Sequence, residues 1–246
     1  ALEHALSQHG DAPSIVVASA GTVNTVDFDD LAAIAALKQR YGFWLHVDAA
    51  FGGIAAAFEP RRALLAGIEF ADSVTVDAHK WLNVPYDCAL LYTAHLPLQL
   101  EVFQNHSAYL SAPVAVADNF LHLTPENSRR FRALPLWMSL LAYGREGYAE
   151  LVERNCASAQ YLGSLIETDP RFRLAAPVRL NVVCFTLADA DKAALAQLHQ
   201  RLQHDGTAYL SPSVLDGRPI LRVAICNWRT TNADMDLTFA ALQRLA

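Results

Sequence analysis

Short apolar runs alternate with helical stretches through the first half of this chain, and no other feature constrains its fold as much. A helix is predicted over Leu31–Arg40, where apolar residues share one face, with Asp27 or Asp29 as its cap and Gly42 as its stop. Strands separated by helices imply right-handed parallel crossovers, and hence an α/β fold with a parallel-rich sheet. The predicted strands are Ser14–Ala18, Phe43–Val47, Ser73–Val76 and Ala89–Thr93, and a short second helix spans Pro60–Ala66.

Polar and charged residues follow three of these strands, at Thr22, at Asp48 and in the segment Asp77–Lys80. In an open parallel sheet, ligands bind at the carboxyl ends of the strands. A lysine amine and an aspartate carboxylate in one crevice suit pyridoxal phosphate (PLP), because its aldehyde can react with the amine and its ring nitrogen can pair with the carboxylate. Taken singly, a lysine after a strand is most often a surface residue, and an aspartate there is most often a helix cap.

The rest of the chain holds a long irregular segment and a second set of elements. Residues 104–128 are rich in Asn, Pro and Ser without a clear period, and such a segment in a compact domain is usually functional or disordered. We therefore expect two domains, residues 1–140 with the site and a small α+β domain over 141–246. The elements predicted after the irregular segment are helices over Leu134–Tyr143, Tyr148–Thr168 and Ala193–His204, strands over Phe172–Ala175, Val182–Leu187, Ala208–Leu210 and Ile220–Cys226, and a closing helix from a cap at Asn232 to Leu245.

Composition and charge exclude several classes of function. The net charge is -6 and no basic run is present, which argues against nucleic acid or an anionic membrane as a partner. The four cysteines are widely spaced and the nine histidines show no metal-ligand spacing, so no metal site is predicted. This cysteine usage fits a reducing compartment, and we expect a cytoplasmic protein. No apolar run is long enough to span a bilayer.

A set of short motifs runs over nearly the whole chain: Gly21-Thr22 with Phe28-Asp29, Trp44–Ala50, Val74–Trp81, Tyr86–Cys88, Tyr109-Leu110, Arg129–Arg132 before Trp137, and Leu221–Cys226. Together they resemble the group II PLP-dependent amino acid decarboxylases, the family of the aromatic amino acid, histidine and glutamate decarboxylases. The resemblance implies a fold type I, PLP-dependent transferase-like structure, of which this chain holds part of the large domain and the small domain. It also implies a homodimer that converts an L-amino acid to its amine and carbon dioxide.

The same resemblance implies roles for five residues at the strand ends. Lys80 would form the Schiff base with the cofactor aldehyde, and Asp48 would pair with the pyridinium nitrogen. Thr22 would lie near the phenolic oxygen of the cofactor. Asp77 falls where some members of the family have an asparagine that contacts the phosphate. His79 would position the lysine or the substrate carboxylate.

Tyr109 lies in the irregular segment, where sequence alone favours an exposed loop tyrosine. In the family that it resembles, this tyrosine lies on a mobile loop that reaches across the dimer into the site of the other subunit. Its hydroxyl would there protonate the carbanion that remains after carbon dioxide leaves. Related enzymes with phenylalanine at this position tend toward oxidative deamination to an aldehyde, so the tyrosine favours simple decarboxylation.

Four arginines are candidates for contacts with a substrate carboxylate or with the cofactor phosphate: Arg129, Arg130, Arg132 and Arg222. The simpler interpretation, which the sequence favours, assigns them to salt bridges between domains and to charges at helix ends. The cysteines are expected in the core.

The family's chains are much longer than this one, and the resemblance covers only their second half. The family's phosphate-binding loop and its ring-stacking histidine are not visible here, so we expect a C-terminal portion, either a fragment or one piece of a split enzyme. Its partner would be a second copy or the N-terminal half. Two alternatives stay open: another fold type I activity, such as a transaminase or a cysteine lyase, and a non-catalytic truncated partner of a full-length decarboxylase. The sequence does not identify the amino acid substrate.

Overall fold

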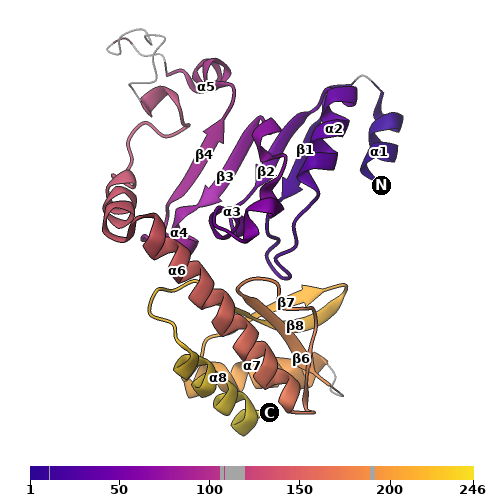
Figure 1. Ribbon diagram of the computed structural model, residues 1–246, viewed down its shortest axis with the longest axis vertical. Coiled ribbons are helices and arrows are strands. Elements are labelled where there is room, and N and C mark those ends of the chain that lie inside the picture. The colour runs from indigo at the N-terminus through magenta and orange to yellow at the C-terminus, as the bar shows by residue number, and fades with distance from the viewer. Residues whose placement is uncertain (11, 106–107, 109–119, 189–191) are drawn as a thin grey trace.

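Two four-stranded sheets, linked by one long helix, make up the fold of this protein (Figure 1). The computed structural model describes residues 1–10, 12–105, 108, 120–188 and 192–246. The first sheet has the strand order β1-β2-β3-β4, and the second has the order β5-β6-β8-β7. The predicted α/β class with a parallel-rich sheet and a smaller α+β part is confirmed.

The first sheet is parallel except at one edge. Strands β1 (Ile15–Ser19), β2 (Trp44–Asp48) and β3 (Ser73–Asp77) run parallel, whereas β4 (Ala89–Thr93) pairs antiparallel with β3. A parallel crossover was therefore the wrong prediction for the fourth strand. A parallel connection needs a dozen or more residues and usually a full helix. The connection over 78–88 holds only the four-residue helix α4 (Ala78–Trp81), so the chain turns back instead.

The helices of the first half cover one face of this sheet (Figure 1). Helix α2 (Leu31–Tyr41) begins at Asp30, whose side chain accepts a 2.9 Å hydrogen bond from Ala33 N, and it ends at Gly42 with φ of 65°. The cap is thus neither of the two predicted aspartates, and Asp29 instead accepts a hydrogen bond from Ser19 N. The other elements are α1 (Leu2–His9), α3 (Gly52–Ala56), α5 (Leu96–Phe103) and short 3₁₀ turns at Arg61–Leu65, Ile68–Phe70 and Phe120–His122.

The second half begins with α6 (Ala133–Thr168), which leaves helical geometry at Gly144, where φ is 59°. The predicted break between two helices therefore exists as a kink, and the expected domain boundary at residue 140 falls within α6. The predicted strand over Ala208–Leu210 is wrong, because the edge strand begins at Ser211. The elements that follow α6 are β5 (Phe172–Leu174), β6 (Val182–Leu187), α7 (Lys192–Asp205), β7 (Ser211–Leu215), β8 (Arg218–Ala224) and α8 (Asn232–Leu245).

A shared apolar core joins the two sheets. Trp81, which follows Lys80, is fully buried and packs with Val182 and Ile220 of the second sheet. Its indole Nε1 donates a 2.6 Å hydrogen bond to Phe51 O, which ties α4 to the loop after β2. In the described part of the chain, no helix has the length and apolar character needed to cross a membrane, and no cluster of three metal-ligating side chains is present.

Candidate active site

A cleft of about 300 Å³ opens where strands β1, β2 and β3 end. Three residues singled out from the sequence, Thr22, Asp48 and Lys80, lie together in its lining. The remaining lining residues are Ser19, Gly21, Val23, Ala50 and Phe51. The fold therefore brings the lysine amine and the aspartate carboxylate to one cavity at the carboxyl ends of neighbouring parallel strands, where open α/β sheets bind ligands.

Lys80 lies on α4, the single helical turn that directly follows β3. Its Nζ is 3.0 Å from Asp77 Oδ2 and 4.8 Å from the centre of the Phe51 ring. The ring face attracts the ammonium through its quadrupole, and the carboxylate balances its charge. With a side chain only 24% exposed, the amine is held at the cleft instead of extending into solvent.

Asp48 is the last residue of β2, and its carboxylate belongs to the cleft lining. Oδ1 accepts a 3.1 Å hydrogen bond from Ala50 N, which fixes the side chain against the turn that follows the strand. Among the described residues, Oδ2 accepts no hydrogen bond. Asp48 thus has one anchored oxygen and one oxygen that can accept a proton-bearing ligand atom from the cleft.

Thr22 lies in the loop after β1, and its hydroxyl is occupied by this loop. Its Oγ1 accepts a 3.0 Å hydrogen bond from Asp27 N and lies 3.1 Å from Thr25 Oγ1. The loop approaches the turn after β2 closely, because a Cβ on Gly21 would lie 2.6 Å from Gly52 N. Gly21 has φ of 98°, a conformation that side chains rarely adopt. These two glycines allow the loops after β1 and β2 to meet beside the cleft.

Asp77 contacts both of its predicted neighbours in the site. Besides Lys80, its Oδ2 lies 3.4 Å from His79 Nε2. His79 Nδ1 is 2.8 Å from the Cys88 carbonyl, and the imidazole stacks on the Tyr86 ring with centroids 3.9 Å apart. Asp77 therefore faces a histidine and a lysine in this structure, and its predicted location beside a phosphate stays a prediction.

Arg222, on β8 of the second sheet, reaches the rim of the cleft. Its Nε donates a 2.6 Å hydrogen bond to Val23 O, and its guanidinium carbon lies 5.6 Å from the centre of the Phe51 ring. Burial lowers the pKa of the Arg222 guanidinium from its ordinary value. Phe51 therefore lies between two cations, Lys80 from the first sheet and Arg222 from the second.

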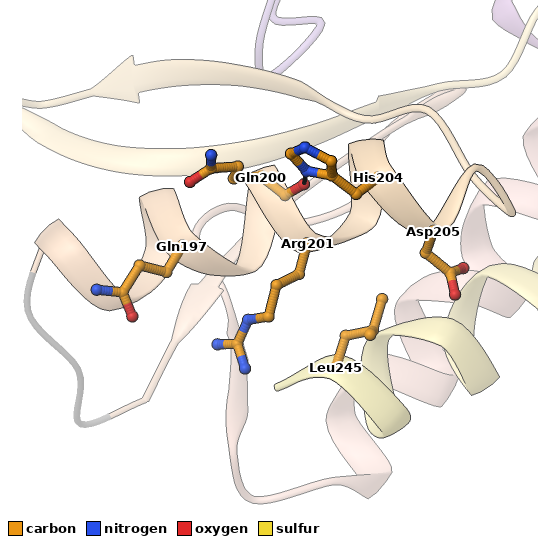
Figure 2. A pocket seen from close by; sticks show the side chains of 6 residues that line it. All are labelled: Gln197, Gln200, Arg201, His204, Asp205 and Leu245. Atoms are coloured by element: carbon orange, nitrogen blue, oxygen red, sulfur yellow. Dashed lines mark hydrogen bonds between the residues drawn. The ribbon is translucent and has the colours of Figure 1, made fainter.

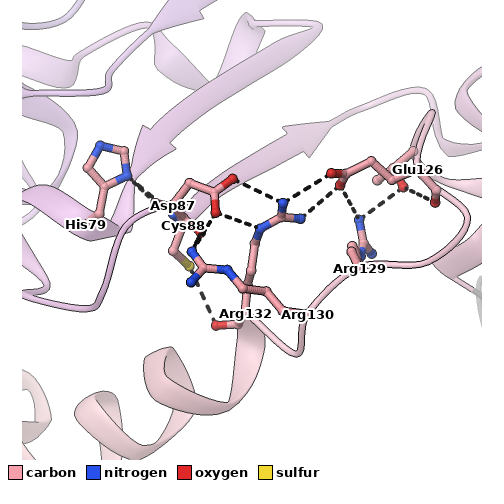
Figure 3. A network of polar contacts seen from close by, with 8 residues as sticks. His79, Asp87, Cys88, Glu126, Arg129, Arg130 and Arg132 are labelled. Atoms are coloured by element: carbon pink, nitrogen blue, oxygen red, sulfur yellow. Dashed lines mark hydrogen bonds and ion pairs between the residues drawn. The ribbon is translucent and has the colours of Figure 1, made fainter.

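The other three candidate arginines belong to a surface ion-pair network (Figure 3). Arg130 Nη2 and Arg132 Nη2 lie 2.5 and 3.0 Å from the Asp87 carboxylate, and Arg132 Nη1 lies 2.8 Å from Glu126. The hydrogen bond from Arg132 is the main cause that lowers the pKa of Asp87 to about 2. These arginines tie the residues before β4 to the segment before α6, so they form salt bridges as the simpler interpretation expects, but within the first predicted domain and not between domains.

A larger hollow of about 670 Å³ lies on the outer side of α7 (Figure 2). It is lined by Gln197, Gln200, Arg201, His204, Asp205 and Leu245. The polar groups of this hollow are engaged locally: His204 Nδ1 lies 2.8 Å from Gln200 O, and Asp205 pairs with Arg244. None of the sequence-predicted site residues lines it, so the smaller cleft at the strand ends is the better candidate site.

Tyr109 lies outside the described residues, so its predicted role stays a prediction. Phe51 is a site residue that the sequence analysis did not single out. Its position three residues after Asp48 was the available signal, since residues directly after a parallel strand line the ligand crevice.

The comparisons with known proteins agree with this geometry. The family model described as "Pyridoxal-dependent decarboxylase conserved domain" matches residues 1–188. The chain belongs to this family of pyridoxal-dependent decarboxylases. PLP is therefore its cofactor, and the cleft offers an amine for the cofactor aldehyde and a carboxylate for the ring nitrogen.

Similar proteins include both decarboxylases and an aldehyde synthase. The chain is 33% identical to the aromatic-L-amino-acid decarboxylase of Drosophila simulans, over 100% of this chain and 49% of that protein. It is 31% identical to 3,4-dihydroxyphenylacetaldehyde synthase of Drosophila melanogaster, over 95% of this chain and 46% of that protein. The structure of Oryza sativa TDC with PLP and tryptamine matches with a TM-score of 0.89 and 28% identity, over 99% of this chain and 53% of that one. The chain thus spans about half the length of the relatives that it matches.

Proposed function

We propose that this protein acts in the decarboxylation of an L-amino acid to its amine and carbon dioxide, with PLP in the cleft at the strand ends. One observation carries the proposal: Lys80 and Asp48, from successive parallel strand ends, line the same 300 Å³ cleft. Membership of the pyridoxal-dependent decarboxylase family supports the reaction class. Since the chain spans about half of its relatives, the activity of the whole protein is part of the proposal.

Lys80 and Asp48 have complementary tasks in this proposal. The Lys80 amine would hold the cofactor at its aldehyde end, because it is the amine that lines the cleft. Ala50 N holds Oδ1 of Asp48, and the free Oδ2 would accept a hydrogen bond from the protonated ring nitrogen of the cofactor. The bound cofactor supplies an electron sink for the bond that breaks.

Arg222 is the residue that we assign to the substrate carboxylate. Its guanidinium lies at the rim of the cleft beside Phe51, and the planar fork of arginine suits a carboxylate. Half-buried on a strand and bonded to Val23 O, it is also held in place. Trp81 and Phe51 exclude water from the inner wall, where the electrostatic interactions of the site are then stronger.

Tyr109 and the assembly state complete the proposal. We assign to the Tyr109 hydroxyl the return of a proton to Cα, in the site of a second subunit of a homodimer. The match to aromatic-L-amino-acid decarboxylases supports aromatic amino acids as the first substrates to test. The described cysteines are free, which supports the further proposal of a cytoplasmic location.

The test is the product formed from a panel of L-amino acids, aromatic ones first, in the presence of PLP. We expect equal amounts of amine and carbon dioxide, and loss of both by roughly 10²–10⁴-fold in Lys80→Ala. The substitution Arg132→Ala, which alters only the surface network, is the matched control and is expected to keep the activity. Transamination without gas would instead favour the transaminase alternative.

Aldehyde in place of amine would point to the chemistry for which the Drosophila melanogaster relative is named. Tyr109→Phe addresses this outcome directly, and we expect slower amine formation with new aldehyde. Unchanged amine output from this variant would remove Tyr109 from the mechanism.

A further inference from the structure

Asn83, two residues after Trp81, makes an unusual set of contacts for a residue in a turn. Its Nδ2 donates hydrogen bonds to Trp81 O at 2.8 Å and to Cys226 O at 2.9 Å, while its Oδ1 accepts one from Trp228 N at 3.1 Å. Its backbone N donates to Lys80 O at 3.2 Å, which closes the turn that ends α4. We refer to these side-chain contacts as the Asn83 bridge.

The Asn83 bridge joins the segment that follows Lys80 to the segment that follows the strand of Arg222. On one side is the turn that follows Lys80, and on the other is the segment after β8, the strand that carries Arg222. The same turn is anchored from a third direction, because Ser139 Oγ and Tyr148 Oη both bond to Leu82 O, at 3.2 and 3.1 Å. The turn after α4 is therefore bonded both to the long helix α6, through Leu82 O, and to the segment after β8, through the Asn83 side chain.

Only an amide side chain satisfies this environment. The bridge has two carbonyl acceptors and one N–H donor, so it requires a group that donates twice and accepts once. Asn83 has φ of 53°, and asparagine is among the few residues with a side chain that adopt this conformation readily. An aspartate would keep the size and the acceptor, but it would set a carboxylate oxygen against two carbonyl oxygens.

We propose that Asn83 is a positioning residue that sets the place of Lys80 relative to Arg222 across the cleft. Asn83 does not line the cleft, and it acts through the backbone segments to which its side chain is bonded. This proposal rests on the proposed function in one respect, which is that PLP is used as the probe of Lys80. The hydrogen bonds of the bridge do not depend on the cofactor.

Two variants separate the side-chain contacts from the backbone conformation. Asn83→Gly keeps the positive φ and deletes the bridge, whereas Asn83→Asp keeps the volume and removes both donors. Hydrogen exchange at the Trp228 amide, which donates to Asn83 Oδ1, reports the bridge directly. We expect exchange at this amide to be roughly three- to tenfold faster in Asn83→Gly, as fits the loss of one hydrogen bond.

The functional readout is the rate at which borohydride traps PLP on Lys80. The chain holds three lysines, Lys38, Lys80 and Lys192, so labelling of the other two, measured by peptide mass spectrometry, is an internal reference. We expect Lys80 labelling to fall several-fold in both variants with Lys38 and Lys192 labelling nearly unchanged, while the unfolding temperature falls because hydrogen bonds are lost. A merely structural residue would lower the unfolding temperature and leave Lys80 labelling as it is.

The experiment distinguishes failure of the positioning role from failure of the proposed function. If the wild-type chain traps PLP on Lys80 and both variants trap it equally fast, the positioning role is overturned and the proposed function stands. If the wild-type chain does not trap PLP on Lys80, the proposed function fails, and unchanged Trp228 amide exchange in Asn83→Gly then overturns the bridge as well. If one variant does not fold, the other still carries the Lys80 labelling readout, which alone decides the positioning role.

Discussion

The second sheet is buried on both faces, whereas the first sheet is buried on only one. In β6, Val183 and Phe185 face a core formed with helices α6, α7 and α8, and Val182 and Cys184 face the first half of the chain. In β1, Ala18 is buried, but Ile15 is 71% exposed. Parallel sheets normally have both faces covered, and this chain spans about half the length of the relatives that it matches.

The exposed face is also the face that carries the chemistry. The register pairs Ile15 with Trp44 and Ser19 with Asp48, and side chains alternate along a strand, so Asp48 points to the same side as Ile15. The core residues Leu45 and Val47 point to the other side. Stability and function are thus divided between the two faces of the first sheet, whereas the second sheet, apart from Arg222, serves as a scaffold.

Truncation of a core side chain in the second sheet is expected to lower the free energy of unfolding most. Phe185 is fully buried and packs edge-on against Phe172, with ring centroids 5.9 Å apart, so Phe185→Ala should cost about 3–5 kcal/mol in the free energy of unfolding. The matched truncation on the exposed face, Val17→Ala, should change it by less than about 0.5 kcal/mol because Val17 is 61% exposed. Urea unfolding measures both, and similar costs would refute the contrast between the sheets.

Substitution of Gly52, beside the cleft, is expected to lower the free energy of unfolding by an intermediate amount. A Cβ on Gly52 would collide with the Ala20 carbonyl and the Phe28 ring, so Gly52→Ala should destabilise the protein by about 1–3 kcal/mol. Because the collision separates the loops after β1 and β2, PLP trapping on Lys80 should fall as well. Urea unfolding and peptide mapping of the trapped lysine are the measurements. Retained stability with unchanged trapping would show that this close approach is not needed.

Loss of the surface ion-pair network before β4 is expected to change stability least, and the change is expected only at acidic pH. Arg132 lowers the pKa of Asp87 from 3.8 to about 2, so this pair stabilises the fold above about pH 4 and loses that contribution as the pH falls toward 2. Asp87→Asn should therefore lose less stability than the wild type between pH 4 and pH 2. Hydrogen exchange should place the difference near β4 and not in β6. Parallel pH profiles for the two proteins would contradict the assignment.

The main helices and strands, and the location of Lys80 and Asp48 in one cleft, could be predicted from the sequence because both depend on local patterns. Apolar periodicity predicts the strands, and the topology of a parallel sheet brings their ends together. The antiparallel direction of β4 was missed although the short connection over 78–88 was visible. The start of β7 at Ser211 was missed because Pro212 is unfavourable in most strands, but β7 is an edge strand, where proline is tolerated.

The contacts between distant segments were beyond sequence reasoning. Arg222 binds the Val23 carbonyl, and Asn83 binds Cys226 and Trp228, across separations that leave no local pattern. The cap of α8 is Thr231 in a capping box with Asp234, one residue before the predicted Asn232, because either side chain can cap a helix. Such choices are decided by packing and not by propensity.

The most direct test of the central claim is to treat the folded chain with PLP and borohydride and to identify the modified lysine by peptide mass spectrometry. If the cleft between Lys80, Asp48 and Phe51 is the cofactor site, the label will be found on Lys80, will exceed that on Lys38 and Lys192, and will fall in Asp48→Ala. Equal labelling of all three lysines, or labelling of Lys80 that Asp48→Ala leaves unchanged, would contradict it.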